Sequence, residues 1–148
     1  MKAVLENKKA RLEYEILESF EAGMELFGFE VKSLRGGNAS LVGARVVVRA
    51  GEAYLVGASI SAYQEKNMPK SYDRERSRRL LLKKKEIEEL SIQEDKKGLT
   101  IIPIMVYSKN NVLKLQVSVV RHKNKHDKRD TLKKRDAKKL IERTLKNE

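Results

Sequence analysis

Two adjoining apolar stretches in the last third of the chain constrain the fold more than any other feature of the sequence. Residues 112–120 (VLKLQVSVV) alternate between apolar and polar side chains, which is the period of a β-strand. Residues 99–107 (LTIIPIMVY) form an apolar run rich in β-branched side chains. Ser108–Asn111 has the composition of a turn, so the two stretches predict an antiparallel hairpin. Pro103 predicts an edge position or a bulge within it.

Further strands are predicted in the first half of the chain. Residues 44–49 and 53–60 form a second hairpin through Gly51, and residues 12–20 alternate imperfectly before 23–29 continue the pattern. About six short antiparallel strands result. A sheet of this size closes into a small barrel or packs as a sandwich. The expected fold class is therefore mainly β, with a small antiparallel barrel.

Helical patterns are fewer and lie between or after the strands. Residues 30–35 precede two glycines and predict a short helix with a glycine stop. Residues 79–97 run from basic to acidic, carry a partial apolar stripe and end at Gly98, which predicts a second helix. Both helices would flank the barrel.

The end of the chain differs in kind from the rest. Apolar residues recur at helical spacing in residues 130–146, but lysines and arginines cover the other faces. One interpretation is a helix packed on the barrel. A lone helix of about 17 residues is marginal in water, so we favour a tail that is disordered alone and becomes helical on a polyanion. The predicted organisation of the 148 residues is a barrel domain over 1–120 and a basic tail over 121–148.

The net charge of +12 is concentrated in two blocks. Residues 66–85 carry nine basic and two acidic side chains, and residues 121–148 carry twelve and five, so each block has a net charge of +7. Residues 1–65 and 86–120 are each close to neutral, at −1. Solubility alone does not require this segregation. Two separate contact surfaces for a polyanionic partner would produce it, and nucleic acid is a more frequent partner of this kind than an anionic membrane.

Nothing in the sequence defines a catalytic or metal site. The chain has no cysteine, and its two histidines, His122 and His126, lie among basic residues that would repel a cation. There is no phosphate-binding glycine loop, and the paired acids Glu88 and Glu89 fit a solvated helix face. We therefore expect no catalytic residues, no metal and no cofactor. The first residues contain no apolar run of signal-peptide length, so the expected location is cytoplasmic.

Tyr72 is the aromatic residue placed among the arginines of the first basic block. It could stack on an RNA base, because aromatic side chains do so with little sequence preference. It could equally lie flat on the barrel. The sequence leaves both interpretations open.

Short motifs in consecutive order give a resemblance that covers nearly the whole chain. They are NKKA at 7–10, GFEVKSLRGG at 28–37, RLLL at 79–82, GLTIIP at 98–103, HDKR at 126–129 and KRDA at 134–137. Together they resemble the signature stretches of the SmpB family of bacterial proteins, which bind tmRNA, also called SsrA RNA.

The resemblance implies a fold, a function and partners. The expected fold is an antiparallel OB-like barrel with flanking helices. The expected function is binding the tRNA-like domain of tmRNA and delivering it to stalled ribosomes for trans-translation, with the tail in the empty mRNA channel near the decoding centre. The expected partners are tmRNA, the small ribosomal subunit with its rRNA, and elongation factor Tu with aminoacylated tmRNA. The protein is expected to act as a monomer and not to bind a membrane.

The resemblance also assigns roles to individual residues. Those expected at the tmRNA interface are Asn7, Lys8, Lys9, Glu30, Lys32, Arg35 and Asn67. Those expected to act from the tail at the decoding centre are His126, Asp127, Lys128, Arg129, Lys133, Lys134 and Arg135. Two other functions stay open from the residues alone: a general ribosome-associated RNA-binding protein, and an RNA-processing enzyme.

Overall fold

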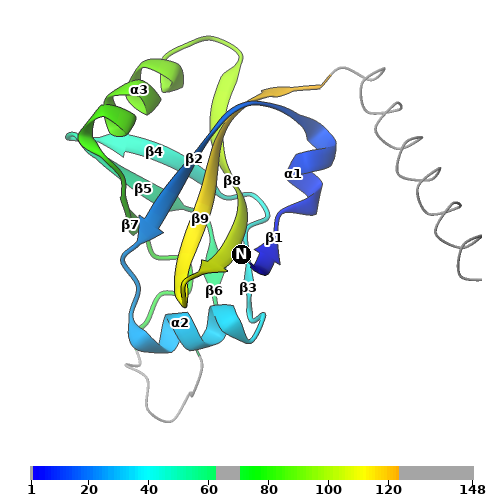
Figure 1. Ribbon diagram of the computed structural model, residues 1–148, viewed down its shortest axis with the longest axis vertical. Coiled ribbons are helices and arrows are strands. Elements are labelled where there is room, and N and C mark those ends of the chain that lie inside the picture. Colours follow the sequence, from blue (N-terminus) through cyan, green and yellow to red (C-terminus); the bar gives the residue numbers. More distant parts are fainter. Residues whose placement is uncertain (1, 63–70, 124–148) are drawn as a thin grey trace, which may run out of the picture.

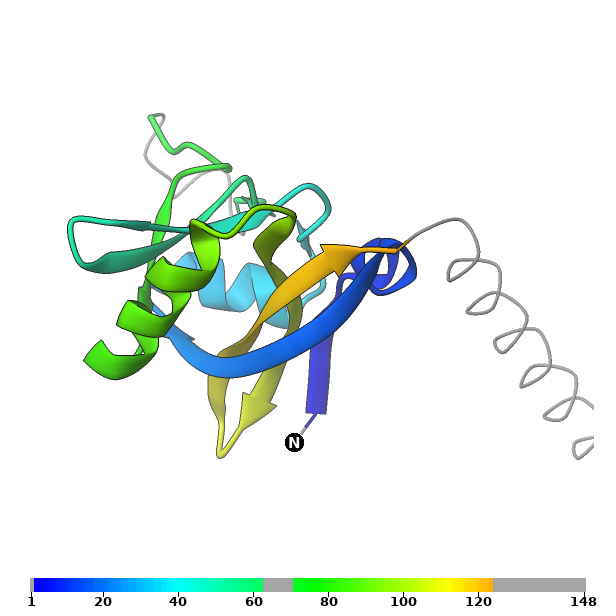
Figure 2. The same ribbon diagram turned by 90° about the horizontal axis from the view of Figure 1, so that it is seen from above.

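The structure is a computed structural model that describes residues 2–62 and 71–123. Its main element is a curved seven-stranded sheet in which every neighbouring pair is antiparallel, in the order β1-β8-β9-β2-β7-β5-β4. The strands are β1 (Lys2–Glu6), β2 (Tyr14–Met24), β4 (Arg45–Arg49), β5 (Glu52–Val56), β7 (Arg78–Leu81), β8 (Leu99–Lys109) and β9 (Val112–His122). A second, two-stranded sheet pairs β3 (Ala39–Ser40) with β6 (Ser59–Ile60). The sheet curls until β4 packs against β8, which makes it barrel-like (Figures 1 and 2).

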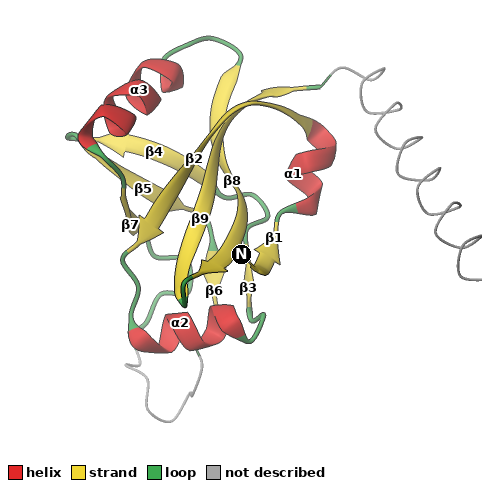
Figure 3. Cartoon of the chain, in the orientation of Figure 1, coloured by secondary structure: helices red, strands yellow, loops and turns green. Residues whose placement is uncertain are grey.

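Within the described ranges three helices flank the sheet, and they are coloured red in Figure 3. They are α1 (Lys8–Glu13), α2 (Gly28–Arg35) and α3 (Lys84–Glu94). Leu34 of α2 and Ile87 and Leu90 of α3 join the main core, and the two helices lie at opposite ends of the barrel. The predicted fold class is therefore confirmed. No helix within the described ranges is long and apolar enough to cross a membrane.

The predicted hairpin of the last third is confirmed as β8 and β9. Lys109 pairs with Val112, and the two residues between them, Asn110 and Asn111, both have positive φ angles of 52° and 63°. Asparagine tolerates this conformation better than most residues, and such a turn matches the twist of the strands it joins. The register shifts between Pro103 and Met105 while β8 lies inside the sheet, so the proline marks a bulge and not an edge.

The two faces of β8 and β9 explain the different patterns of their sequences. Leu113, Leu115, Val117 and Val119 of β9 all face the main core, as their alternation predicts. On the other face Ala10 of α1 covers Ile102, Ile104 and Val120 in a second cluster. Because α1 lies on this face, β8 is buried on both sides over part of its length. A strand buried on both sides needs a continuous apolar run.

Several sequence-based predictions of secondary structure are wrong in part. The strand pattern predicted over 23–29 ends at Met24, because α2 begins at Gly28, and the strand predicted over 53–60 is divided between β5 and β6. Residues 79–97 are not one helix, since Arg78–Leu81 forms β7 and α3 begins only at Lys84. Leu80 is 1% exposed and pairs with Ala53 of β5, so burial between two strands decides this segment. The strand predicted over 12–20 begins at Tyr14, because α1 takes the residues before it.

Candidate nucleic-acid interface

Asn7 holds α1 in place and does not face solvent. Its side chain, in a residue only 4% exposed, donates to the carbonyl oxygens of Leu41 at 3.3 Å and Pro103 at 3.0 Å. Its side-chain oxygen accepts from the backbone N–H of Ala10, which caps the helix. Asn7 therefore fixes α1 against the barrel, and any effect it has on RNA binding would be indirect.

Lys8 and Lys9 follow Asn7 on α1, and both are exposed. Lys32 and Arg35 lie on α2, where Arg35 donates to the Asn111 carbonyl at 2.8 Å and so ties α2 to the β8–β9 turn. Figure 1 places α1 and α2 on separate parts of the surface. The predicted RNA-binding residues of the described chain therefore fall into two groups and do not form one patch.

Glu30 is buried at the centre of a polar cluster with Tyr72, Arg76 and Arg78, here called the Glu30 cluster. The residue is 0% exposed. Arg78 donates to its carboxylate from Nε at 3.0 Å and Nη2 at 2.8 Å, and the Tyr72 hydroxyl donates at 2.9 Å. Arg76 forms a further ion pair with it, and the backbone N–H of Phe27 donates at 2.8 Å. Glu30, which the resemblance places at the tmRNA interface, is thus completely buried, so any effect it has on RNA binding would act through the residues that it holds.

The ionisation of Glu30 depends on these donors. Burial raises the pKa of the Glu30 carboxyl, but hydrogen bonds from Arg76, Phe27, Arg78 and Tyr72 together outweigh it, so the pKa lies below its ordinary value. Burial and the neighbouring carboxylate both raise the pKa of the Tyr72 hydroxyl, which therefore stays protonated and donates. The pKa shifts of Glu30 and Tyr72 thus favour the protonation states that their hydrogen bonds require.

The Glu30 cluster also joins the chain on both sides of residues 63–70. Arg78 donates to the carbonyl oxygens of Ala58 at 2.8 Å and Arg74 at 2.9 Å, and Tyr72 donates to that of Ile60 at 3.0 Å. The Tyr72 ring packs edge-on against Phe29, with ring centres 4.9 Å apart. Of the two interpretations of Tyr72, the structure favours the one in which it packs on the barrel.

The first basic block carries less accessible charge than its sequence suggests. Arg76 and Arg78 form ion pairs with Glu30, and Arg79 forms ion pairs with Glu25 and Glu52, both at 2.9 Å. Residue counting could not detect this, because these acidic partners lie far away in the sequence.

Lys83, Lys84 and Lys85 at the start of α3 are exposed, and within residues 2–62 and 71–123 none of them forms an ion pair. A positive charge at a helix N-terminus opposes the helix dipole. This lysine run therefore costs folding stability and offers unpaired charge to a polyanion. The motifs do not single it out, although three consecutive lysines are themselves a signal in the sequence.

Residues 121–123, here called the root of the tail, contact α1 through Lys123. β9 continues to His122, two residues beyond the predicted domain boundary, and the His122 ring lies 4.3 Å from that of Tyr14. Lys123 donates from its backbone N–H to the Glu13 carbonyl at 2.9 Å and from Nζ to the Arg11 carbonyl at 3.3 Å. Eight predicted site residues lie outside the described residues: Asn67, His126, Asp127, Lys128, Arg129, Lys133, Lys134 and Arg135.

A small antiparallel barrel flanked by helices that carry exposed lysines is characteristic of nucleic-acid-binding β-barrel proteins. A protein-family model described as "SmpB protein" matches residues 4–147. The chain belongs to the SmpB family, as the sequence motifs predict.

Similar proteins agree with this assignment. An SsrA-binding protein of Ligilactobacillus salivarius is 44% identical over 145 residues, covering 98% of this chain and 93% of its own. That of Gloeothece citriformis is 41% identical, covering 98% and 94%. A solved structure described as "tmRNA-SmpB: a journey to the center of the bacterial ribosome" contains a chain with 38% identity and a TM-score of 0.68, covering 88% of this chain and 94% of its own.

The Glu30→Gln substitution tests whether the buried ion pair stabilises the barrel. It keeps the shape but leaves Arg78 buried beside a neutral amide, so the free energy of unfolding should fall by about 3–5 kcal/mol. Urea unfolding measures this, and Glu88→Gln on the exposed face of α3 makes the same change in charge without a buried partner.

The pH dependence of that difference has a defined sign. The folded-state pKa of Glu30 is lowered from 4.5, so its stabilising contribution is present above that pH and is lost as the pH falls below it. The gap in unfolding free energy between the wild type and Glu30→Gln should therefore shrink below about pH 4.5. A gap that stays constant down to pH 3 would show that ionisation of Glu30 contributes nothing.

Proposed function

We propose that this protein binds the tRNA-like domain of tmRNA and delivers it to stalled ribosomes for trans-translation. The observation that carries this proposal is the family match, which extends over residues 4–147 and so includes both the barrel and the tail. The relatives are named for binding SsrA RNA, and the similar solved chain comes from work on tmRNA-SmpB and the bacterial ribosome.

The barrel is the part that holds the tRNA-like domain in this proposal. Lys8 and Lys9 on α1 and the lysine run Lys83–Lys85 on α3 supply attraction to phosphates. Lys32 and Arg35 on α2 provide a second group of contacts. The Glu30 cluster acts as a positioning element, because it fixes the chain on either side of residues 63–70, where the predicted contact Asn67 lies.

The tail is the part that works on the ribosome. Its residues His126–Arg129 and Lys133–Arg135 match the family segment that enters the empty mRNA channel of the small subunit and acts at the decoding centre. Lys123 supports this division of labour, because its bonds to α1 fix the point from which the tail leaves the barrel.

The protein does no chemistry of its own in this proposal. It acts in the cytoplasm as a monomeric adaptor, with elongation factor Tu accompanying the aminoacylated tmRNA. A general ribosome-associated RNA-binding protein would bind tmRNA no more tightly than bulk tRNA. An RNA-processing enzyme would cleave or modify RNA with turnover, so parallel binding and activity assays separate the three possibilities.

Reversing the charges of the lysine run should separate stability from function. In the double variant Lys84→Glu, Lys85→Glu, acidic side chains in the first turn of α3 should raise the unfolding free energy by about 0.3–1 kcal/mol each. The affinity for tmRNA should fall, and the slope of log affinity against log salt should decrease by about 0.7–0.9 for each phosphate that the variant no longer neutralises.

The matched control is Lys96→Glu, Lys97→Glu just beyond the other end of α3, where the residues are also exposed. It makes the same change in net charge but removes cations that favour the helix dipole, so it should be less stable. Equal losses of tmRNA affinity in the two double variants would show that net charge alone governs binding and that the lysine run is no specific contact.

A truncation tests the division between barrel and tail. The truncated chain ends at Lys123, because β9 runs to His122 and the backbone of Lys123 is hydrogen-bonded to α1. The 1–123 chain should bind tmRNA with nearly normal affinity but should not support peptide tagging on a stalled ribosome in a reconstituted translation system. A full-length chain with residues 124–148 in scrambled order serves as the control for tail charge. Normal tagging by either chain contradicts the proposed role of the tail.

A further inference from the structure

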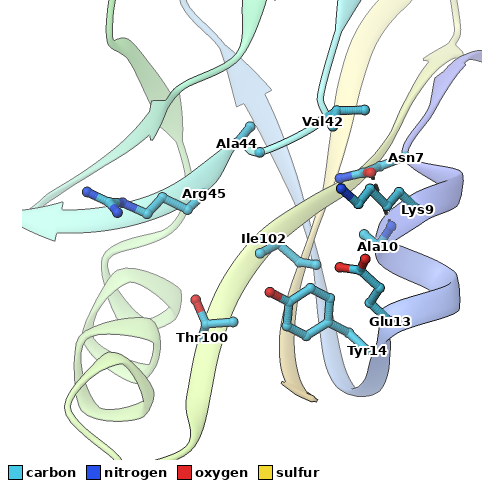
Figure 4. A pocket seen from close by; sticks show the side chains of 11 residues that line it. Asn7, Lys9, Ala10, Glu13, Tyr14, Val42, Ala44, Arg45, Thr100 and Ile102 are labelled. Carbon is cyan, nitrogen blue, oxygen red and sulfur yellow. Dashed lines mark hydrogen bonds between the residues drawn. The ribbon is translucent and has the colours of Figure 1, made fainter. Parts of the chain in front are cut away.

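A pocket beside α1 is lined in part by Lys9, and the function described so far gives no role to its interior (Figure 4). It has a volume of about 350 Å³ and lies between α1, the loop before β4 and strand β8. Sites for small molecules span roughly 300–1,000 Å³, so this pocket suits one nucleotide rather than a helix. Lys9, Glu13 and Tyr14 point into it from α1 and the start of β2, toward Ile102 of β8, whereas the Arg45 guanidinium points away along β4.

The walls of this pocket are fixed to one another. The Asn7 side chain donates one hydrogen bond to the carbonyl oxygen of Leu41, just before the loop that forms one wall. It donates a second to the carbonyl oxygen of Pro103, which follows Ile102 in the wall formed by β8. Its cap on Ala10 holds the third wall, α1. A pocket whose walls share a buried, fully bonded side chain is preformed, so a ligand need not supply the free energy to assemble it.

Glu13 is the residue that gives this pocket its chemistry. Its carboxylate lines the pocket, and no cation in the described part of the chain forms an ion pair with it, although Lys9 lies one helical turn away. On a surface that binds RNA, a carboxylate repels every phosphate. It can only accept hydrogen bonds, so its favourable partner in RNA is a base edge that donates.

Guanine is the base that best fits a carboxylate acceptor. Its Watson–Crick edge carries two adjacent donors, N1–H and N2–H, which match the two oxygens of a carboxylate. Adenine, cytosine and uracil place an acceptor beside each donor on that edge, and the acceptor would face the negative charge. Unpaired bases of RNA are commonly read on this edge.

We propose that this pocket binds one unpaired guanine of the RNA partner. Glu13 accepts the two hydrogen bonds of the guanine edge, Lys9 neutralises the adjoining phosphate, and Tyr14 and the exposed Val42 provide apolar contact with the base. The inference rests on the proposed function only in that the protein binds RNA. The guanine can belong to tmRNA or to ribosomal RNA, since the chemistry of recognition is the same.

Mononucleotides test the pocket directly. Titration of the ¹⁵N-labelled full chain with 5′-GMP should shift the amide signals of Ala10, Glu13 and Gly43, with an affinity about tenfold higher than that for 5′-AMP or 5′-UMP. 5′-IMP lacks the N2 amino group and should bind with intermediate affinity. Glu13→Gln should bring the GMP and AMP affinities to within about twofold, whereas Glu88→Gln on α3 should keep the preference. Equal binding of GMP and AMP to the wild type, or a preference that survives in Glu13→Gln, overturns the proposal.

Binding to large RNAs identifies the source of the guanine. If Glu13→Gln weakens binding to isolated tmRNA, the base belongs to tmRNA; if it weakens only binding to the small ribosomal subunit, the base belongs to rRNA. If it weakens neither, the pocket has no RNA ligand and the proposal fails. A wild-type protein that prefers GMP but does not bind tmRNA would contradict the proposed function without contradicting the proposed guanine pocket. Tight tmRNA binding without any nucleotide preference would support the proposed function and contradict the guanine pocket.

Discussion

The buried ion pair between Glu30 and Arg78 is the interaction on which the arrangement of the barrel's α2 end depends. Both side chains are 0% exposed, and a buried charge is tolerated only when a partner and hydrogen bonds replace its water. Here Arg78 comes from β7, Glu30 from α2, and Arg78 also reaches the carbonyl of Ala58 just before β6. One ion pair therefore joins a strand of the large sheet, a helix and the small sheet, and loss of either charge would leave the other buried without a partner.

This use of arginine changes how the charge of the protein should be interpreted. A net charge counts all basic residues equally, but Arg76, Arg78 and Arg79 are paired within the protein, whereas Lys83–Lys85 form no ion pair with the described residues. The arginines make planar, multiply bonded contacts that build the fold, and the lysines stay hydrated at the surface. The net charge of the first basic block therefore overstates the unpaired charge at its surface, and the lysine run opposes the dipole of α3.

The sequence predicts the parts of the fold that rest on local periodicity. The β8–β9 hairpin and helix α2 follow from patterns within about 20 residues, and Pro103 indicates either a bulge or an edge, between which the structure decides for the bulge. The assignment of β7 failed because its four residues are shaped by neighbours from β2 and β5. The Glu30 cluster was harder to predict than β7, because Glu30 contacts arginines that lie 46 and 48 residues away in the sequence. No local pattern distinguishes a buried carboxylate from an exposed one. The motifs identified the family, but they could not place its residues inside or outside the protein.

Helix α1 is the point at which binding by the barrel can be coupled to the tail. Its start is fixed to the barrel by Asn7, and its end has carbonyl groups that lack partners within the helix, as every helix end does. Lys123 supplies donors to two of these carbonyls, at Arg11 and Glu13, and a cation there also favours the helix dipole. The pocket with Glu13, the lysines of α1 and the root of the tail are thus parts of one rigid unit. An RNA bound to α1 would therefore be held in a fixed orientation relative to the point at which the tail leaves the barrel, without any change in the conformation of the barrel itself.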